Sequence, residues 1–445
     1  MKKYIVRVLN ILLISAAVNA PFIVSGLPTV VKIAAGVLLG VYFLLFNILP
    51  TFEKYPTFRL RILGDGAELI LFFFITCIVS VPFAVISIVE LVNGADDYVK
   101  YIVQFAVLVI AETVIFWNGI IRVYFTSVQL GIRLRVLGIV FGMIFPVNLV
   151  MLMIIYLTTH GECKFESGKI RLNESRKDDR ICETKYPVLM VHGVFFRDSK
   201  LLNYWGRIPA ELEKNGATVY YGEQQSALSV EESSKELADK IKDIAAKTGC
   251  GKVNIIAHSK GGLDARYAIS MLGCDKYVAS LTTVNTPHRG CLFAEYLLKA
   301  APEKVTRFIE NTYNGAFQAL GDNSPDFMSA VRNLTAGFCE EFNKKVIDSP
   351  EVVYQSIGSK AKNRRSGRFP LNVSYPVVKK HDGDNDGLVA IEATEWGEKW
   401  IRLYPKGNRG ITHADVIDLN RENIKGFDVR EFYVQLVADL KNRGL

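Results

Sequence analysis

Long apolar runs in the first third of the chain constrain its fold more than any other feature. Each of five runs is long enough to cross a hydrocarbon layer of about 30 Å, which takes roughly 20 helical residues. They are Tyr4 to Gly26, Val30 to Leu49, Glu68 to Val92, Tyr98 to Ile121 and Leu134 to Leu157. From Gly161 onward, short apolar segments alternate with polar ones and with turns. The sequence therefore predicts an all-α membrane region of about five transmembrane helices, followed by a globular region.

Basic residues beside these runs predict the orientation of the chain. They precede the first run and follow the second and the fourth: Lys2, Lys3 and Arg7; Lys54, Arg59 and Arg61; Arg122, Arg133 and Arg135. The connections at 25–29 and 93–97 contain no Lys or Arg. Basic ends are cytoplasmic by the positive-inside rule. Five crossings would then place everything after Leu157 outside the cell, in a multi-pass protein of the cell membrane.

A secretory signal peptide is an alternative interpretation of the first run, because basic residues precede it. The four runs that follow favour a membrane helix. Glu112 lies inside the fourth run, and we interpret it as a protonated or locally paired group, since no second ionisable residue lies at comparable depth. The net charge of +8 does not indicate nucleic acid, because no basic stripe with interleaved aromatics is present and much of the excess lies in the connections.

Six of the seven cysteines follow the apolar runs, in the part predicted to be external, where disulfides are permitted. Cys250 precedes an apolar strand and Cys274 follows the next helix, so this pair is expected to meet at one end of a strand-helix unit. Further candidate pairs are Cys163 with Cys182 and Cys291 with Cys339. The seventh, Cys77, lies inside a run and is expected to pack there.

A serine between a strand and a helix gives the globular region its chemistry. The apolar run from Tyr186 ends in a turn, and Val253 to Ala257 and Leu263 to Leu272 are expected to form a later strand and helix. Ser259 lies between them, followed by Gly261 and Gly262, as a sharp nucleophile turn requires. The usual glycine two residues before the serine is replaced by Ala257. A helix N-cap is the alternative role for this serine.

A serine nucleophile needs a base and an acid that orients the base, in the chain order Ser, Asp or Glu, His. Asp386 lies in an acidic loop, and His413 is the one histidine downstream of that loop. The loop also matches the first six positions of a calcium-binding EF loop, but its twelfth position is Ala393 rather than Glu. Backbone N–H groups of Val194 and Lys260 can meet the developing oxyanion.

With these motifs, residues Tyr186 to Leu445 resemble the bacterial triacylglycerol lipases of the Pseudomonas and Burkholderia type. The motifs that carry the resemblance are Tyr204-Trp205-Gly206, residues 216–220, residues 285–290, residues 385–389 and His413-Ala414-Asp415. The resemblance implies an α/β-hydrolase fold, with Ser259 as nucleophile, Asp386 rather than Asp382 or Asp384 as acid, His413 as base, and Val194 and Lys260 as oxyanion donors. It also implies no cofactor for the chemistry, and a structural calcium ion with Asp415 as one ligand. A second carboxylate ligand cannot be placed.

The resemblance further implies a lid over the site between Cys291 and Phe338. Its apolar residues could face either lipid or core, and they are Phe293, Leu297, Phe308, Phe317 and Leu320. Core packing is the default for such spacing.

We therefore predict a transmembrane region at 1–160, a linker at 161–184 with a possible disulfide, and an α/β-hydrolase domain with a mostly parallel sheet at 185–445. The predicted function is a membrane-tethered serine ester hydrolase, a lipase or carboxylesterase, that cleaves acyl lipids through an acyl-serine intermediate. Its predicted partners are a lipid or ester substrate and the bilayer, without nucleic acid. Alternatives are an acyltransferase, a phospholipase, a deacylase of lipid-modified protein, or a non-catalytic lipid-binding membrane protein or transporter.

Overall fold

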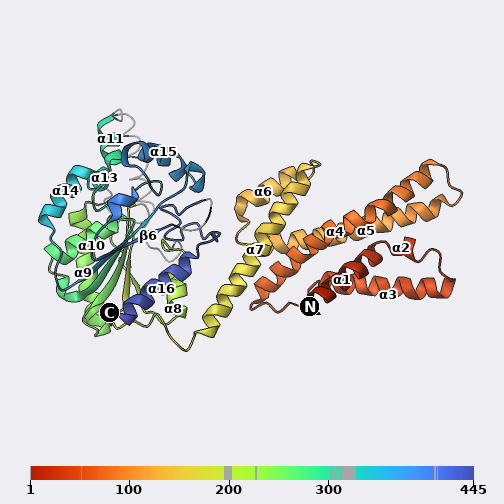
Figure 1. Cartoon of the computed structure of the whole chain (residues 1–445), viewed down its shortest axis with the longest axis horizontal. Coiled ribbons are helices and arrows are strands. Elements are labelled where there is room, and N and C mark those ends of the chain that lie inside the picture. The colour runs from red at the N-terminus through yellow and green to blue at the C-terminus, as the bar shows by residue number, and fades with distance from the viewer. Residues whose placement is uncertain are drawn as a thin grey trace. The chain divides into compact units, whose positions relative to one another are not determined.

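The computed structural model forms two compact units, Met1–Glu174 and Ser175–Leu445, and each is considered by itself (Figure 1). The residues it describes are 2–51, 53–194, 203–225, 228–300, 303, 307, 311, 327–404, 407 and 409–445.

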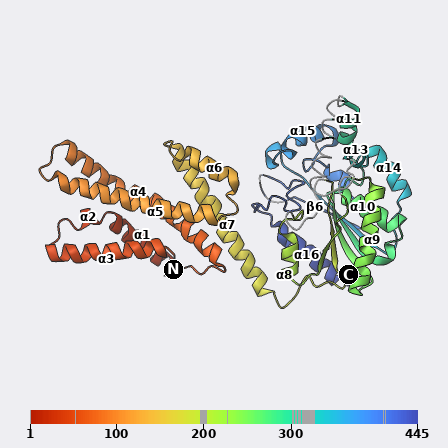
Figure 2. The ribbon, with the colours of Figure 1, turned by 180° about the vertical axis from the view of Figure 1, so that it is seen from behind.

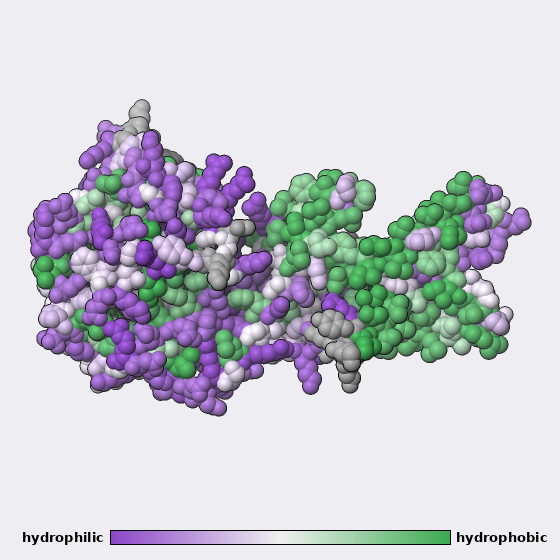
Figure 3. Space-filling model, in the orientation of Figure 1, coloured by the Kyte–Doolittle hydropathy of each residue, from purple (hydrophilic) through white to green (hydrophobic). Residues whose placement is uncertain are grey.

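Helices alone make up the first unit. Their bounds are α1 Lys2–Val18, α2 Ala20–Ile23, α3 Thr29–Ile48, α4 Phe58–Val92, α5 Tyr98–Thr126, α6 Gly131–Phe141 and α7 Val147–Ser175. By length and composition, α3, α4 and α5 could each cross a membrane. Many of their apolar side chains face outward, as the apolar surface over this unit shows (Figure 3), while others pack between the helices. These three helices suggest that the protein associates with a membrane.

The first and last of the five predicted runs are not single helices. In the first run, α1 ends at Val18 and Pro21 lies in the first turn of α2, where its missing N–H costs no helical hydrogen bond. In the last, the helix stops at Phe141 and restarts at Val147, directly after Pro146, whose ring and missing N–H weaken a helix at this point. The predicted linker at 161–184 is also partly helical, because α7 continues to Ser175.

The second unit is built on a parallel sheet. In the described part of the chain it has six strands in the order β2-β1-β3-β4-β5-β6, with every neighbouring pair parallel. The bounds are β1 Val188–Val191, β2 Val219–Tyr221, β3 Val253–His258, β4 Val278–Val284, β5 Val353–Ser359 and β6 Lys399–Leu403. This is the predicted α/β-hydrolase architecture, and β3 confirms the strand expected before Ser259.

Helices cover both faces of this sheet (Figures 1 and 2). Their bounds are α8 Ile208–Lys214, α9 Val230–Thr248, α10 Lys260–Met271, α11 Leu292–Ala300, α13 Phe327–Arg332, α14 Ala336–Lys345, α15 Leu371–Asp382 and α16 Val429–Asn442. Residues of α9 and α10 share one core cluster with Leu189 and Leu281, and residues of α8 and α16 share another with Ile256 and Ile357. The central strands β3 and β4 are buried on both sides, as in other parallel sheets.

None of the predicted disulfides forms, and all seven cysteines, which lie within the described residues, are free. The cysteines of each expected pair lie in different surroundings, although Cys291 and Cys339 are close enough to interact electrostatically. Cys182, Cys274, Cys291 and Cys339 each belong to a different core cluster of the second unit, while Cys163 packs in the first unit. Cys250 is exposed, whereas its expected partner Cys274 is buried.

Candidate active site

Ser259 occupies a strained turn between β3 and α10. Its backbone has φ 54° and ψ −131°, a conformation that L-residues rarely adopt and that functional sites often hold. The turn needs the two glycines that follow. A Cβ on Gly261 would lie 2.3 Å from the carbonyl oxygen of His192, and a Cβ on Gly262 would lie 2.1 Å from Thr286 Oγ1. The alternative role as an N-cap is not supported, because the Ser259 side chain makes no cap hydrogen bond.

Asp386 and His413 form a buried pair. His413 Nδ1 lies 2.6 Å from Asp386 Oδ2, and the His413 backbone N–H donates to the Asp386 carbonyl oxygen at 2.9 Å. The other carboxylate oxygen, Asp386 Oδ1, accepts the backbone N–H groups of Leu388 and Val389 at 2.9 and 2.8 Å. Both side chains are therefore fixed, and Nε2 is the ring nitrogen of His413 that remains for a substrate or a nucleophile.

Asn285 also holds the acid, a role that sequence reasoning missed. Its Nδ2 donates to Asp386 Oδ2 at 2.7 Å and to Ser359 Oγ at 2.8 Å, while its Oδ1 accepts the Ser359 backbone N–H at 2.9 Å. Asn285 follows β4 directly and Ser359 ends β5, so the carboxyl ends of two neighbouring strands position the carboxylate. The available signal was an Asn directly after a buried strand.

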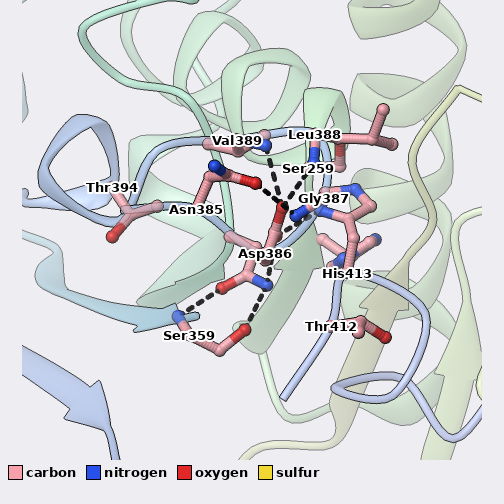
Figure 4. A network of polar contacts seen from close by, with 12 residues as sticks. Ser259, Ser359, Asn385, Asp386, Gly387, Leu388, Val389, Thr394, Thr412 and His413 are labelled. Atoms are coloured by element: carbon pink, nitrogen blue, oxygen red, sulfur yellow. Dashed lines mark hydrogen bonds and ion pairs between the residues drawn. The ribbon is translucent and has the colours of Figure 1, made fainter. Parts of the chain in front are cut away.

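Ser259 lies next to the ring of His413 (Figure 4). Within the described residues no hydrogen bond joins the Ser259 hydroxyl to His413, a contact that in free enzymes often tightens only once substrate binds. The ring of His258 lies 4.4 Å from that of His413, between centroids. Burial lowers the pKa of His258 well below its ordinary value, and the nearby His413 lowers it further, so His258 is held neutral.

Tyr204 connects the loop after β1 to this histidine. Its hydroxyl lies 2.6 Å from His258 Nδ1 and accepts the Gly193 backbone N–H at 3.1 Å. Gly193 is closely packed, since a Cβ there would lie 2.8 Å from Ser259 Cβ. Tyr204 thus fixes the loop that carries Val194 close to the nucleophile, and its part in the site was not predicted.

The two expected oxyanion donors lie on either side of Ser259. Val194 follows Gly193, and Lys260 is the first residue of α10, where a backbone N–H has no partner within the helix. Neither N–H donates to another backbone group in the described part of the chain. The Lys260 side chain points elsewhere: its Nζ lies 2.8 Å from Asp264 Oδ1 and 2.9 Å from Ser233 Oγ. Both N–H groups are therefore free to meet a substrate oxygen.

The acidic loop does not form an EF site. Asp382 accepts the backbone N–H groups of Leu292 and Phe293 at the start of α11. Asp384 pairs with Lys360 and Lys379, which lower its pKa to about 2. With Asp386 bound to His413, the three carboxylates face different partners. The described residues contain no cluster of three or more metal-ligating side chains.

Asp415 likewise lies among donors rather than calcium ligands. Its Oδ1 lies 3.0 Å from Arg409 Nη2, and its Oδ2 accepts the Thr412 backbone N–H at 3.0 Å. Arg409 also contacts Glu422 Oε2 at 2.8 Å and donates to the Ser366 carbonyl at 2.9 Å. Calcium takes six to eight oxygen ligands. A guanidinium occupies the position beside Asp415 where the implied cation would bind, so this donor set does not fit calcium.

Most of the expected lid lies outside the described residues. Phe308, Phe317 and Leu320 belong to this part, as does the side chain of Leu297. The interval begins with α11, which shares a small core cluster through Ala294 with Val389 from the acidic loop. The start of the interval is therefore packed beside the loop that carries Asp386.

Comparisons with known proteins find similar lipases. A family model described as Lipase (class 2) matches residues 185–287. A triacylglycerol lipase of Vibrio cholerae is 34% identical over 287 residues, which cover 59% of this chain and 90% of that protein. One of Burkholderia plantarii is 33% identical over 178 residues, covering 37% and 49%. The chain thus spans about half the length of the latter relative. A crystal structure of Bacillus licheniformis lipase BlEst2 in mature form is 21% identical, with a TM-score of 0.43, covering 57% of this chain and 92% of that one.

Proposed function

Because the chain belongs to the class 2 lipase family, we propose that it is a carboxylic ester hydrolase with Ser259 as its nucleophile. The observation that carries the proposal is the buried Asp386–His413 pair beside a serine held in a strained turn. A non-catalytic lipid-binding protein would have no need of this arrangement, because strain and buried polar networks are retained where chemistry requires them.

The mechanism follows from the positions of these groups. Ser259 Oγ attacks the ester carbonyl while His413 Nε2 takes its proton, and Asp386 stabilises the imidazolium that forms. The backbone N–H groups of Val194 and Lys260 bind the oxyanion. His413 then returns the proton to the leaving alcohol, which leaves an acyl group on Ser259. Water, deprotonated by His413, attacks this acyl-serine and releases the carboxylic acid, so that the free serine is restored.

We propose acyl lipids as the substrate class. Two observations support this: the relatives are named triacylglycerol lipases, and the first unit carries helices suited to a bilayer. A protein inserted in a membrane meets its lipid ester substrates at that surface. The alternatives are phospholipase, acyltransferase and lipid-protein deacylase activities. They use the same acyl-serine and differ in the headgroup or the acceptor, so a substrate panel separates them.

We also propose that the first unit spans the membrane several times. The apolar outer surfaces of α3, α4 and α5 support this, since exposed apolar area on this scale requires an apolar solvent. The placement of the second unit outside the cell, expected from five crossings, depends on whether the region of α6 and α7 is itself a crossing.

For the loop of the base, we propose that Arg409 replaces a structural cation. Its guanidinium bridges Asp415 and Glu422, which follow His413 in the chain, and thereby fixes this loop without a metal. The chemistry itself is expected to need no cofactor.

A substrate panel tests the proposed function. The full chain in detergent micelles or liposomes is assayed on emulsified triacylglycerols, phospholipid vesicles and short soluble esters. We expect ester hydrolysis that rises when emulsified substrate is present and that disappears in Ser259→Ala. Ser349→Ala is the matched control, because Ser349 precedes β5 and so lies at the amino-terminal ends of the strands, whereas Ser259 lies at their carboxyl ends. Activity that survives in Ser259→Ala, or a folded chain that hydrolyses no ester, would contradict the proposal.

A further inference from the structure

The segment Gly131 to Gly161, here the α6–α7 hairpin, is too short on one arm to cross a membrane. Its first arm, α6, has 11 residues. At 1.5 Å per residue this arm rises about 16 Å, roughly half of the 30 Å hydrocarbon thickness. The chain reverses after Phe141 and descends again in α7 from Val147. The apolar run that looked like one crossing is therefore folded back on itself.

Glu162 shows where the hairpin returns. Its carboxylate accepts the Ser127 hydroxyl at 2.6 Å and the backbone N–H groups of Val128 and Gln129 at 3.1 and 3.0 Å. These three residues form the connection that leads from α5 into α6. The carboxylate is buried and lies 2.7 Å from Arg59 Nη1. The chain thus leaves the hairpin at the end of the unit where it entered, so the hairpin does not cross the membrane.

Contacts between the other helices show which connections lie at this same end of the first unit, here called the shared level. Arg59 at the start of α4 donates to the Thr126 carbonyl at 2.7 Å, and Arg122 near the end of α5 donates to the Asn47 carbonyl at the end of α3, also at 2.7 Å. Farther along α7, Arg171 donates to the Lys54 carbonyl at 2.7 Å. The end of α3, both ends of the α6–α7 hairpin and the start of α4 therefore lie together.

The N-terminus belongs to the same end of the unit. Arg7 donates to Glu68 at 2.9 Å and Asn19 to Ser80 at 2.9 Å, two contacts with the same sequence separation of 61 residues. This constant offset means that α1 runs parallel to α4, so both begin at one level. At the other end of the unit, Gln104 near the start of α5 contacts the Pro21 carbonyl at 3.3 Å. The segments up to Thr126 thus traverse the unit four times.

The tip of the hairpin is apolar and uncovered in the first unit. Met143 is 93% exposed and Phe145 is 77% exposed, and Ile139 and Val140 beside them are also exposed. The base is polar and fixed, because Arg135 donates to the Tyr124 and Ser127 carbonyls at 3.1 and 2.5 Å. An apolar tip above an arginine-rich base matches the layering of a lipid leaflet, with the tip in hydrocarbon and the base at the headgroups. It also continues the apolar surface of α3, α4 and α5.

We propose that the α6–α7 hairpin inserts into one leaflet and returns, so that the hydrolase unit lies on the cytoplasmic side. The basic residues found earlier beside the first, second and fourth runs all belong to the shared level, and Lys164, Lys169 and Arg171 after the hairpin add to it. At the opposite level, Asp96 and Asp97 lie in a connection and Lys32 and Lys100 lie in the first turns of α3 and α5, so the excess of basic residues is at the shared level. By the positive-inside rule the shared level is cytoplasmic. The inner leaflet is then the lipid surface on the side of the hydrolase unit.

The cysteines agree with this placement. Cytosolic thiols are kept reduced, whereas the extracellular side favours disulfides. All six cysteines from Cys163 onward are free, and five of them are buried. The sequence predicted that the hydrolase unit lies outside the cell, because it counted the hairpin as a fifth crossing. With four crossings, the positive-inside rule places the unit on the cytoplasmic side. This inference rests on the proposed membrane insertion and is independent of the proposed chemistry.

Thiol labelling in intact cells tests the side. Cys250 is the exposed cysteine of the hydrolase unit. Cells with the full chain in their plasma membrane are treated with a maleimide that cannot cross membranes. We expect at least tenfold more labelling of Cys250 after permeabilisation than before. Cys250→Ser/Asp96→Cys is the matched control, and its new thiol should react fully in intact cells. Equal labelling of Cys250 before and after permeabilisation overturns the proposal.

A second measurement tests the hairpin itself. A nitroxide is attached to the thiol introduced by Met143→Cys, in a background of Cys77→Ala and Cys250→Ser. In liposomes we expect collisions with oxygen to exceed those with a water-soluble nickel complex, while Asp96→Cys in the same background shows the reverse. A tip that collides mainly with the nickel complex overturns leaflet insertion. Release of the chain from membranes by alkaline carbonate would overturn the insertion on which both proposals depend, whereas hydrolysis by Ser259 would be unaffected.

Discussion

The two units bury apolar side chains alike but expose different kinds of side chain. In the second unit apolar residues fill both faces of the sheet, and polar groups gather where the strands end, around Ser259. In the first unit apolar residues cover the outside, and buried polar groups such as Glu162 and Asn19 join one helix to another. Buried polar contacts therefore have two roles in this protein. In the second unit they hold the catalytic residues in place, and in the first unit they fix the positions of the helices.

This comparison predicts that buried polar substitutions in the second unit cost activity, whereas those in the first unit cost stability and leave turnover unchanged. Substitutions in each unit test this division between effects on activity and effects on stability.

The largest effect is expected for Ser259→Ala. Without the nucleophile no acyl-serine can form, so kcat for ester hydrolysis should fall by about 10⁵-fold or more. The melting temperature should stay within a few degrees, and relief of the strained turn could even raise it. Initial rates on a chromogenic short-chain ester, together with thermal melts in detergent, check both parts. A large loss of stability would mean that Ser259 has a structural role instead.

Asp386→Asn should have the next largest effect. The amide cannot hold His413 in the required tautomer while it stabilises the imidazolium, and in serine triads this change costs about 10⁴-fold in kcat. Asp384→Asn, two residues away, is the control and should keep kcat within about twofold, because Asp384 faces Lys360 and Lys379. If both variants behaved alike, the assignment of the acid would be wrong.

Arg409→Gln should affect both stability and turnover. The variant leaves the buried Asp415 without its cation, which should destabilise the unit by about 2 to 3 kcal/mol and lower kcat about tenfold through the loop of His413. Arg368→Gln, which removes a more exposed partner of Glu422, is the control and should change little. The wild-type enzyme should keep its activity in excess calcium chelator. Inactivation by the chelator, reversed by added calcium, would argue for a metal.

Glu162→Gln should affect only the first unit. The amide accepts fewer of the hydrogen bonds from 127–129 and lacks the charge that pairs with Arg59. The free energy of unfolding of this unit should therefore fall by about 2 kcal/mol. The kcat of the folded protein should not change. Glu174→Gln, an exposed position on the same helix, is the control for stability. A fall in kcat without a fall in stability would break the proposed division between the units.

The smallest effect is expected from the pH dependence of Asp384. Its pKa in the folded chain, about 2, lies below the ordinary value of 3.8, because Lys360 and Lys379 favour the charged form. The group therefore adds stability above about pH 4, and this is lost as the pH falls towards 2. The pair is partly exposed, so screening should keep the contribution below about 1 kcal/mol. Melts of wild type and Asp384→Asn should differ slightly at pH 7 and converge only as the pH falls to about 2.

Sequence reasoning identified the second unit better than the first. Ser259 and its glycines could be recognised because backbone crowding permits few residues at that turn. Asp386 and His413 could be found because the α/β-hydrolase fold places its acid and then its base after the serine in the chain. Asn285 and Tyr204 were missed, because their roles depend on contacts between strands and loops far apart in the chain.

In the first unit, hydropathy located the apolar runs but not the reversal after Phe141. Apolar composition is the same for a crossing and for a hairpin, and what distinguishes them is the short α6 together with the contacts of Glu162 with 127–129. The expected disulfides failed for a related reason, since spacing in the chain does not reveal which core each sulfur joins.

Covalent labelling tests the central claim most directly. The purified full chain is treated with a fluorophosphonate, digested, and the modified residue located by mass spectrometry. We predict a single adduct on Ser259 that is absent in Ser259→Ala and retained in Ser349→Ala, with labelling slowed strongly by Asp386→Asn. A folded chain that takes up no reagent, or that carries it on another residue, would contradict the claim that Ser259 is an activated nucleophile.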